Sequence, residues 1–253
     1  MSIFKITREN RIVLIAVLSI SIISFAIAYL YYSGINKSED PRVVETKFMF
    51  GRYDASIRAK NYDNAFSILD SIEHILTKLS GYSDSYELGI IYNNRASIYI
   101  SKALYEEKDS IGKKLLLDTA FVHTNKCVEH YNKWIERFGK LSEADILSEV
   151  KPHFLENDDA FKGKRYQKIL SKRVKDIILA QKETPRRLSV AYTNLGIIQR
   201  HTYMQTKAIE SYITAIKLWK ENPAALSNLN VLYGKPSTDR SIFEKLFPPD
   251  KNK

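Results

Sequence analysis

The segment NLGIIQRHTYMQTKAIESYITAIKLW, residues 194–219, places small residues at fixed positions among large ones. Gly196, Ala208 and Ala215 are the small residues, and Tyr212 lies between the two alanines. Two helices that cross closely need small residues at the crossing and bulky residues around it. The segment therefore predicts two helices, joined by a tight turn, that touch at Gly196 and Ala208.

Helical patterning continues through nearly all of the chain after residue 41. The 253 residues include only 9 Gly and 7 Pro, and no segment favours a strand, so the sequence predicts an all-α fold. Ser142 with Asp145 resembles a capping box, and both Thr184-Pro185 and Asn222-Pro223 place a capping side chain before a first-turn proline. The expected helices cover 42–59, 62–79, 84–107, 112–138, 142–155, 158–182, 185–202, 205–220, 223–233 and 239–246.

The spacing in the first segment resembles the signature of the tetratricopeptide repeat, a pair of antiparallel helices. The residues that match this signature in order are Tyr192, Leu195, Gly196, Ala208, Tyr212 and Ala215. Two positions depart from it, because Gln199 replaces an aromatic residue and the closing proline comes late, at Pro223. The resemblance implies an α-solenoid of stacked helix pairs with a concave binding face.

Two further helix pairs are expected upstream. In residues 60–72, Ala65, Leu69 and Ile72 repeat the spacing, and Gly51 is a candidate for the small residue that is missing at Tyr53.

The first helix of the next pair fits the signature in two alternative registers, one with Leu88-Gly89 and Tyr92 and the other with Tyr92, Ala96 and Tyr99. Its second helix carries Ala120, Thr124 and Cys127 at the expected spacing. The residues assigned to repeat packing are Leu88, Gly89, Ala120, Cys127, Tyr192, Leu195, Gly196, Ala208, Tyr212 and Ala215.

The most apolar stretch of the chain lies near its N-terminus. Residues 12–32, IVLIAVLSISIISFAIAYLYY, are 21 residues without a charge, and at 1.5 Å per residue they can cross a hydrocarbon core of about 30 Å. They predict a transmembrane helix between an N-terminal segment, 1–11, and a linker, 33–41. A cleaved signal peptide is the alternative, because Ala26-Ile27-Ala28 resembles a cleavage site.

Membrane orientation depends on the basic residues that flank this span on both sides. Arg11, directly before the span, favours a cytoplasmic N-terminus. We therefore expect a single-pass protein of the inner (cytoplasmic) membrane. Its helical repeat domain, 42–247, would lie on the periplasmic or extracytoplasmic side and end in a disordered tail, 248–253. Frequent Lys, Ile, Asn and Tyr suggest an AT-rich bacterial genome.

The repeat resemblance also implies partner-binding residues, because the concave groove of this family is lined by Asn, Lys and Arg of the first helices. The candidates here are Asn93, Asn94, Arg95, Asn194 and Arg200. A solvated helix surface is the alternative for each of them. Arg95 and Arg200 suit a partner that presents carboxylates, because the planar guanidinium binds them with two hydrogen bonds.

The net charge of +10 favours acidic partners. A basic patch is predicted at Lys162, Lys164, Arg165, Lys168, Lys172, Arg173 and Lys175. The patch could bind an acidic protein or anionic lipid headgroups, and a solvated helix face is again the alternative. Few aromatic residues accompany it, so no nucleic acid partner is expected.

No motif for catalysis or cofactor binding occurs in the sequence. His123, Cys127 and His130 share one helix face at metal-ligand spacing, but a fourth ligand is not evident and Cys127 also fills a small packing position. We therefore expect neither a catalytic residue, nor a metal, nor a cofactor.

The expected function is that of a membrane-anchored scaffold or adaptor. It would bind partner proteins, presenting acidic, helical or peptide segments, within a bacterial envelope assembly such as a motor, secretion or wall-synthesis machine. The alternative is an accessory or ligand-sensing subunit of an envelope enzyme or transporter, which requires a closed pocket lined by perturbed ionisable groups. Homo-oligomerisation is left open.

Overall fold

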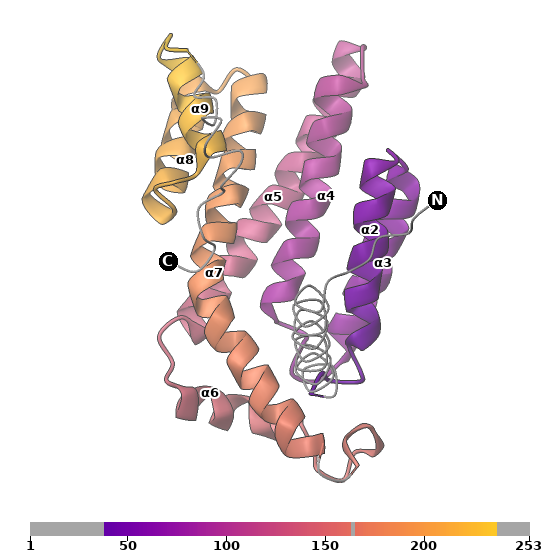
Figure 1. Cartoon of the computed structure of the whole chain (residues 1–253). Coiled ribbons are helices and arrows are strands. Elements are labelled where there is room, and N and C mark those ends of the chain that lie inside the picture. Colours follow the sequence, from indigo (N-terminus) through magenta and orange to yellow (C-terminus); the bar gives the residue numbers. More distant parts are fainter. Residues whose placement is uncertain (1–37, 163–164, 237–253) are drawn as a thin grey trace, which may run out of the picture.

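A computed structural model describes residues 38–162 and 165–236 (Figure 1). All regular elements in these residues are helical, which confirms the all-α class. The predicted span 12–32, the expected helix 239–246 and the tail 248–253 lie outside the described residues. None of the helices that the structure describes is both long and apolar enough to span a bilayer.

The described helices pack as consecutive pairs. Helices α2 and α3, α4 and α5, and α7 and α8 lie side by side, while α5 packs on α7 and α3 on α4 (Figure 1). Helix α6 lies against α7, and α9 covers α8. The elements are α2 Val44–Arg58, α3 Tyr62–Lys78, α4 Tyr86–Tyr105, α5 Ser110–Phe138, α6 Glu143–Val150, η1 Lys151–His153, η2 Asp159–Phe161, α7 Arg165–His201, α8 Gln205–Leu218 and α9 Pro223–Leu232.

Two of the predicted helix starts are confirmed. The Ser142 hydroxyl and the Asp145 carboxylate form a capping box at the start of α6. The Asn222 side chain accepts a hydrogen bond from the Ala225 backbone N–H, and Pro223 occupies the first turn of α9. These signals act locally, so they could be read from the sequence.

The predicted break at Thr184-Pro185 is wrong. Helix α7 continues through both residues for 37 residues, and Thr184 is fully buried within it. An internal proline costs a helix about 3 kcal/mol, but the apolar face of α7 continues across it. Ile177 before the proline and Leu188 after it belong to one core, so burial on both sides outweighs the local penalty.

Two helix pairs contain the same close contact between a glycine and a tyrosine ring. A Cβ added at Gly196 in α7 would lie 2.5 Å from Cε1 of Tyr212 in α8. A Cβ added at Gly89 in α4 would lie 2.3 Å from Cε1 of Tyr131 in α5. Each ring therefore lies against helix backbone, at a distance that a side chain on the first helix would prevent.

The contact at Gly89 decides between the alternative registers of the second pair. Gly89, rather than Ala96, receives the aromatic ring. On α5, Cys127 and Tyr131 have the same spacing as Ala208 and Tyr212, and all four are buried. On α5 the contact residues are therefore Cys127 and Tyr131, two helical turns beyond the expected Ala120 and Thr124. The shift arises because α4 and α5 both extend well beyond the point where they cross, and only then does the loop join them.

Gly51 does not serve as the small contact residue of the first pair. A Cβ added there would meet no atom within 4 Å. Tyr53 is buried instead, and Ala65, Leu69 and Ile72 are fully buried on α3. The first pair therefore packs through large residues of α2 rather than through a glycine.

Candidate functional site

The inner faces of α4 and α7, which were expected to line an open groove, contact each other directly. The Asn194 side-chain amide donates to Asn93 Oδ1 at 3.0 Å and to Ser97 Oγ at 3.3 Å. Two of the predicted partner-binding residues are therefore engaged with each other. Asn94, beside them on α4, is half-buried.

Arg95 joins two helix pairs. Its side chain is 8% exposed, and its guanidinium donates to Asp70 Oδ1 at 2.5 Å and to Glu73 Oε2, both on α3. Burial alone would raise the pKa of Glu73, but the hydrogen bonds and charges of Arg95 and Lys126 lower it below the ordinary range. The sequence predicts Arg95 as a contact for carboxylates of a partner protein, whereas in the structure its guanidinium binds carboxylates of the same chain.

The predicted basic patch is divided between different environments. Arg173 is only 5% exposed and lies in the interior. Lys172 binds Asp176, and Lys162 pairs with Asp159 at 2.7 Å. The remaining described members, Arg165, Lys168 and Lys175, are exposed, and Lys164 lies outside the described residues.

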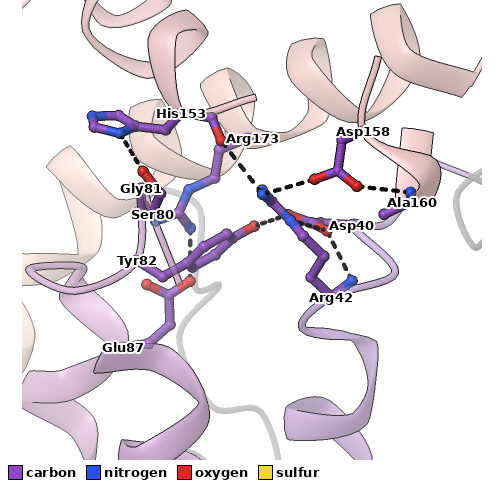
Figure 2. Close-up of polar contacts among 10 residues, drawn as sticks. All are labelled: Asp40, Arg42, Ser80, Gly81, Tyr82, Glu87, His153, Asp158, Ala160 and Arg173. Carbon is purple, nitrogen blue, oxygen red and sulfur yellow. Dashed lines mark hydrogen bonds and ion pairs between the residues drawn. The ribbon is translucent and has the colours of Figure 1, made fainter. Parts of the chain in front are cut away.

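Arg173 belongs to a buried polar network, which we call the basal network, formed by Asp40, Arg42, Tyr82, Glu87 and Arg173 (Figure 2). Arg173 Nη1 donates to Glu87 Oε1 at 2.8 Å, and the guanidinium lies 4.1 Å from the Tyr82 ring centroid. The Tyr82 hydroxyl donates to Asp40 Oδ2 at 3.0 Å. The first residues of the described chain are thereby connected to the α3–α4 loop and to α7.

Arg42 connects the same network to the segment between α6 and α7. Its guanidinium lies 4.6 Å from the Phe154 ring centroid and 4.5 Å from that of Phe161. It also donates to Asp40 and, at 3.4 Å, to the His153 carbonyl oxygen. No local pattern predicts this network, because its members come from three separate segments of the chain and contact a fourth, between α6 and α7.

A cavity of about 90 Å³ borders the basal network. Glu87 Oε2 and Arg173 Nε face no hydrogen-bond partner among the described residues, and both residues line this cavity together with Lys172 and Asp176. Such a space admits a few water molecules, whereas pockets for small ligands measure about 300–1,000 Å³. The cavity is therefore too small for such a ligand and lies beside the structural ion pair of Glu87 and Arg173.

A larger cleft of about 770 Å³ lies where α7 ends, between the start of α5 and the α7–α8 turn. We call it the cationic cleft, because Lys113, Lys114 and Arg200 line it and none of its lining residues within 38–162 and 165–236 is acidic. Figure 1 shows the α4–α5 loop and the α7–α8 turn at one end of the molecule, with α6 and the start of α7 at the other. Of the predicted partner-binding residues, Arg200 lines this cleft.

Apolar side chains accompany these charges. Leu117 is buried below the cleft, whereas Ile111 is 78% and Tyr203 91% exposed. Arg200 Nη1 donates to Asn228 Oδ1 of α9 at 3.3 Å, which orients its guanidinium. Removal from water, followed by the charges of Arg200 and Lys113, lowers the pKa of His201 below its ordinary value. The sequence predicts Arg200 as a binding residue, but it carries no signal for the α5 side of the cleft, because α5 and the α7–α8 turn are far apart along the chain.

The three residues with metal-ligand spacing on α5 have separate contacts. Cys127 Sγ donates to the Gly89 carbonyl oxygen at 3.3 Å, and His130 Nε2 lies 2.7 Å from the Ser85 carbonyl oxygen. His123 stacks on Tyr99 with ring planes 6° apart. In the part of the chain that the structure describes, no three His, Cys, Asp or Glu side chains are arranged to hold a metal ion.

The chain matches no protein-family model, no curated protein and no solved structure. A functional proposal for this protein therefore depends on its own fold and surface.

Proposed function

We propose that this protein is a membrane-anchored helical scaffold that binds a partner protein at the cationic cleft, within a bacterial envelope assembly. The observation that carries the proposal is the cleft itself. Its volume of about 770 Å³ is in the range of binding sites, and its charges have one sign. Such a surface attracts and orients an oppositely charged partner.

The proposal includes an α-solenoid of tetratricopeptide-like helix pairs as the architecture. The repeated contact of a glycine with a tyrosine ring, at Gly89 with Tyr131 and at Gly196 with Tyr212, supports this architecture. Stacked pairs of this kind offer extended surfaces for other macromolecules. The basic side chains of the cleft are then contacts for a partner rather than catalytic groups.

Helix α7 separates the cleft from the basal network. With a rise of 1.5 Å per residue, Arg173 and Arg200 lie about 40 Å apart along the helix. The predicted span 12–32 precedes Asp40 in the sequence, so the chain enters the fold at the basal network. A partner in the cleft would therefore be held at the end of the molecule remote from that entry.

The alternative, a ligand-sensing accessory subunit, has less support. It requires a closed pocket lined by perturbed ionisable groups, and the partly open cavity beside Glu87 and Arg173 has only the lining of such a pocket. However, its volume of about 90 Å³ is too small for a metabolite.

Site-specific photo-crosslinking in intact cells tests the scaffold proposal. A photo-reactive amino acid at Ile111 of the full-length protein should form an adduct with a second protein, whereas the same amino acid at exposed Lys133, near the other end of α5, should not. Reversing two charges in the cleft, Lys113→Glu with Lys114→Glu, should lower the adduct yield about tenfold or more, which corresponds to about 1.4 kcal/mol.

The charge-matched control for this experiment is Lys140→Glu with Lys220→Glu, because both lysines are exposed and remote from the cleft lining. This control should leave the adduct unchanged. Identical adducts at Ile111 and Lys133 would refute the proposal, and so would an adduct yield that does not change when the charges in the cleft are reversed.

A further inference from the structure

We propose that Tyr203 is a partner-binding residue and that the cationic cleft takes an acidic peptide segment carrying an aliphatic or aromatic side chain. This inference rests on the proposed function and specifies the chemical class of the partner. The backbone of Tyr203, the charges around it and the apolar surface beside it support the inference.

Tyr203 has a backbone conformation that usually belongs to glycine. Its φ is +63°, and the Met204 N–H donates to the Gln199 carbonyl oxygen at 2.8 Å, as at a helix C-terminus closed by a left-handed residue. A tyrosine is strained in this conformation. With 91% of its surface exposed, burial within the chain does not offset that strain.

An exposed, strained aromatic residue at the edge of a cleft is well placed for recognition. Strained residues gather where proteins bind ligands, and tyrosine offers a large contact area with few rotatable bonds. The Tyr203 ring, between α7 and α8, contributes little packing to the described fold. We therefore infer that it contacts a ligand outside the chain.

The charges and apolar groups of the cleft together select the ligand class. Lys113, Lys114 and Arg200 favour an anionic ligand, since none of the described residues that line the cleft carries a negative charge. Ile111, which is largely exposed, adds apolar surface that an inorganic anion leaves uncovered. A single-stranded nucleic acid would need a series of aromatic rings for stacking, and among the described lining residues only Tyr203 is an aromatic of that kind. An acidic peptide with an apolar side chain satisfies both requirements.

Fluorescence anisotropy of the full-length protein in detergent micelles tests this inference. The probe is a labelled 12-residue peptide of glutamates with Leu or Phe at every third or fourth position, and the control peptide replaces each Glu with Gln. The acidic peptide should bind at least tenfold more tightly, and its affinity should fall as salt is raised. Tyr203→Ala should weaken its binding about tenfold.

The variant Tyr203→Gly separates recognition from folding. Glycine relieves the strain, so its thermal midpoint should rise by about 2–4 °C while peptide binding weakens. Lys60→Gly is the matched control, because Lys60 has a φ of +56° at the end of α2 and lies outside the cleft lining. It should raise the thermal midpoint in the same way and leave peptide binding unchanged.

Several results would overturn the inference: equal affinity for the two peptides, unchanged binding by Tyr203→Gly, or displacement of the acidic peptide by inorganic phosphate or a 12-nucleotide DNA strand at similar charge concentration. If these occurred while the Ile111 adduct persisted in cells, the scaffold proposal would stand and the ligand class would be wrong. Peptide binding without any adduct in cells would refute the scaffold proposal instead.

Discussion

Gly89 and Gly196 have no side chain, and this determines how closely the neighbouring helix can pack at each position. Each leaves room for a tyrosine ring from the neighbouring helix, at Tyr131 and Tyr212. The ring cannot move away easily, because Tyr131 and Tyr212 are fully buried. Replacing either glycine with alanine adds one methyl group, so this substitution tests the contact with the ring.

We predict that Gly196→Ala lowers the free energy of unfolding by about 2 kcal/mol or more, because the added Cβ would lie 2.5 Å from the Tyr212 ring and overpacking carries a cost of this size. Gly51→Ala on α2 is the matched control, since its Cβ meets no atom within 4 Å. It should raise stability by about 0.5–1 kcal/mol through helix propensity. Denaturant unfolding monitored by circular dichroism measures both changes, and equal effects would contradict the assigned contact.

At the scale of an element, α7 shows how tertiary packing overrides a local signal. Proline after a capping threonine predicts a helix start, but the helix runs from Arg165 to His201 without interruption. Helix α6 contacts α7, and α8 contacts α7 as well. A helix that is buried against several neighbours can retain an internal proline, because the apolar surface on either side of it stays covered.

Amide hydrogen exchange distinguishes one continuous helix from two. In a continuous α7, the N–H groups of Arg186 and Arg187 bond to carbonyl oxygens four residues earlier and should be protected. At the start of a new helix those N–H groups would be unpaired and exchange fast. We predict protection comparable to that of Ala191, with the first-turn amides of α8, Thr206 and Lys207, as the unprotected reference. Rapid exchange at both positions would support two separate helices instead.

For the whole molecule, the basal network connects the start of the described chain to segments that are distant in sequence. Glu87 and Arg173 form its ion pair. Burial by itself raises the pKa of Glu87, but Arg173 outweighs burial and keeps the pKa below its ordinary value of 4.5. Because the folded pKa is depressed, this pair contributes stability above about pH 4.5 that is lost as the pH falls through the folded pKa.

Arg173→Met should lower the free energy of unfolding by about 3–5 kcal/mol at neutral pH, because Glu87 is left charged and buried without its partner. Burial then raises the pKa of Glu87, so acidification favours the folded variant while it destabilises the wild type. The stability difference should therefore shrink between pH 6 and pH 4. Unfolding curves at several pH values measure this trend.

Two further variants complete the experiment. Arg173→Met with Glu87→Met should recover most of the lost stability, since no unpaired charge remains. Lys175→Met, at an exposed position on the same helix, should change stability by no more than about 0.5 kcal/mol. A pH-independent loss in Arg173→Met would show that the arginine acts through packing alone.

The sequence alone determined the properties that depend on neighbours along the chain. Helical periodicity gave the all-α class, capping residues placed the starts of α6 and α9, and the small residues around Tyr212 gave the contact between α7 and α8. The sequence also predicts Arg200 as a contact for acidic partners, and in the structure Arg200 lines the cationic cleft. Each of these depends on spacings within one helix or one helix pair.

Only the tertiary structure decided which charges stay available to a partner. Arg95 and Arg173 have the same chemistry as Arg200 in the sequence, but the fold brings carboxylates of α3 and α4 to them. It leaves the α7–α8 turn beside the lysines of α5, and no acidic side chain lines this cleft in the part of the chain that the structure describes. The physical reason is that a buried charge must be paired, and which partner reaches it depends on how helices distant in sequence pack together.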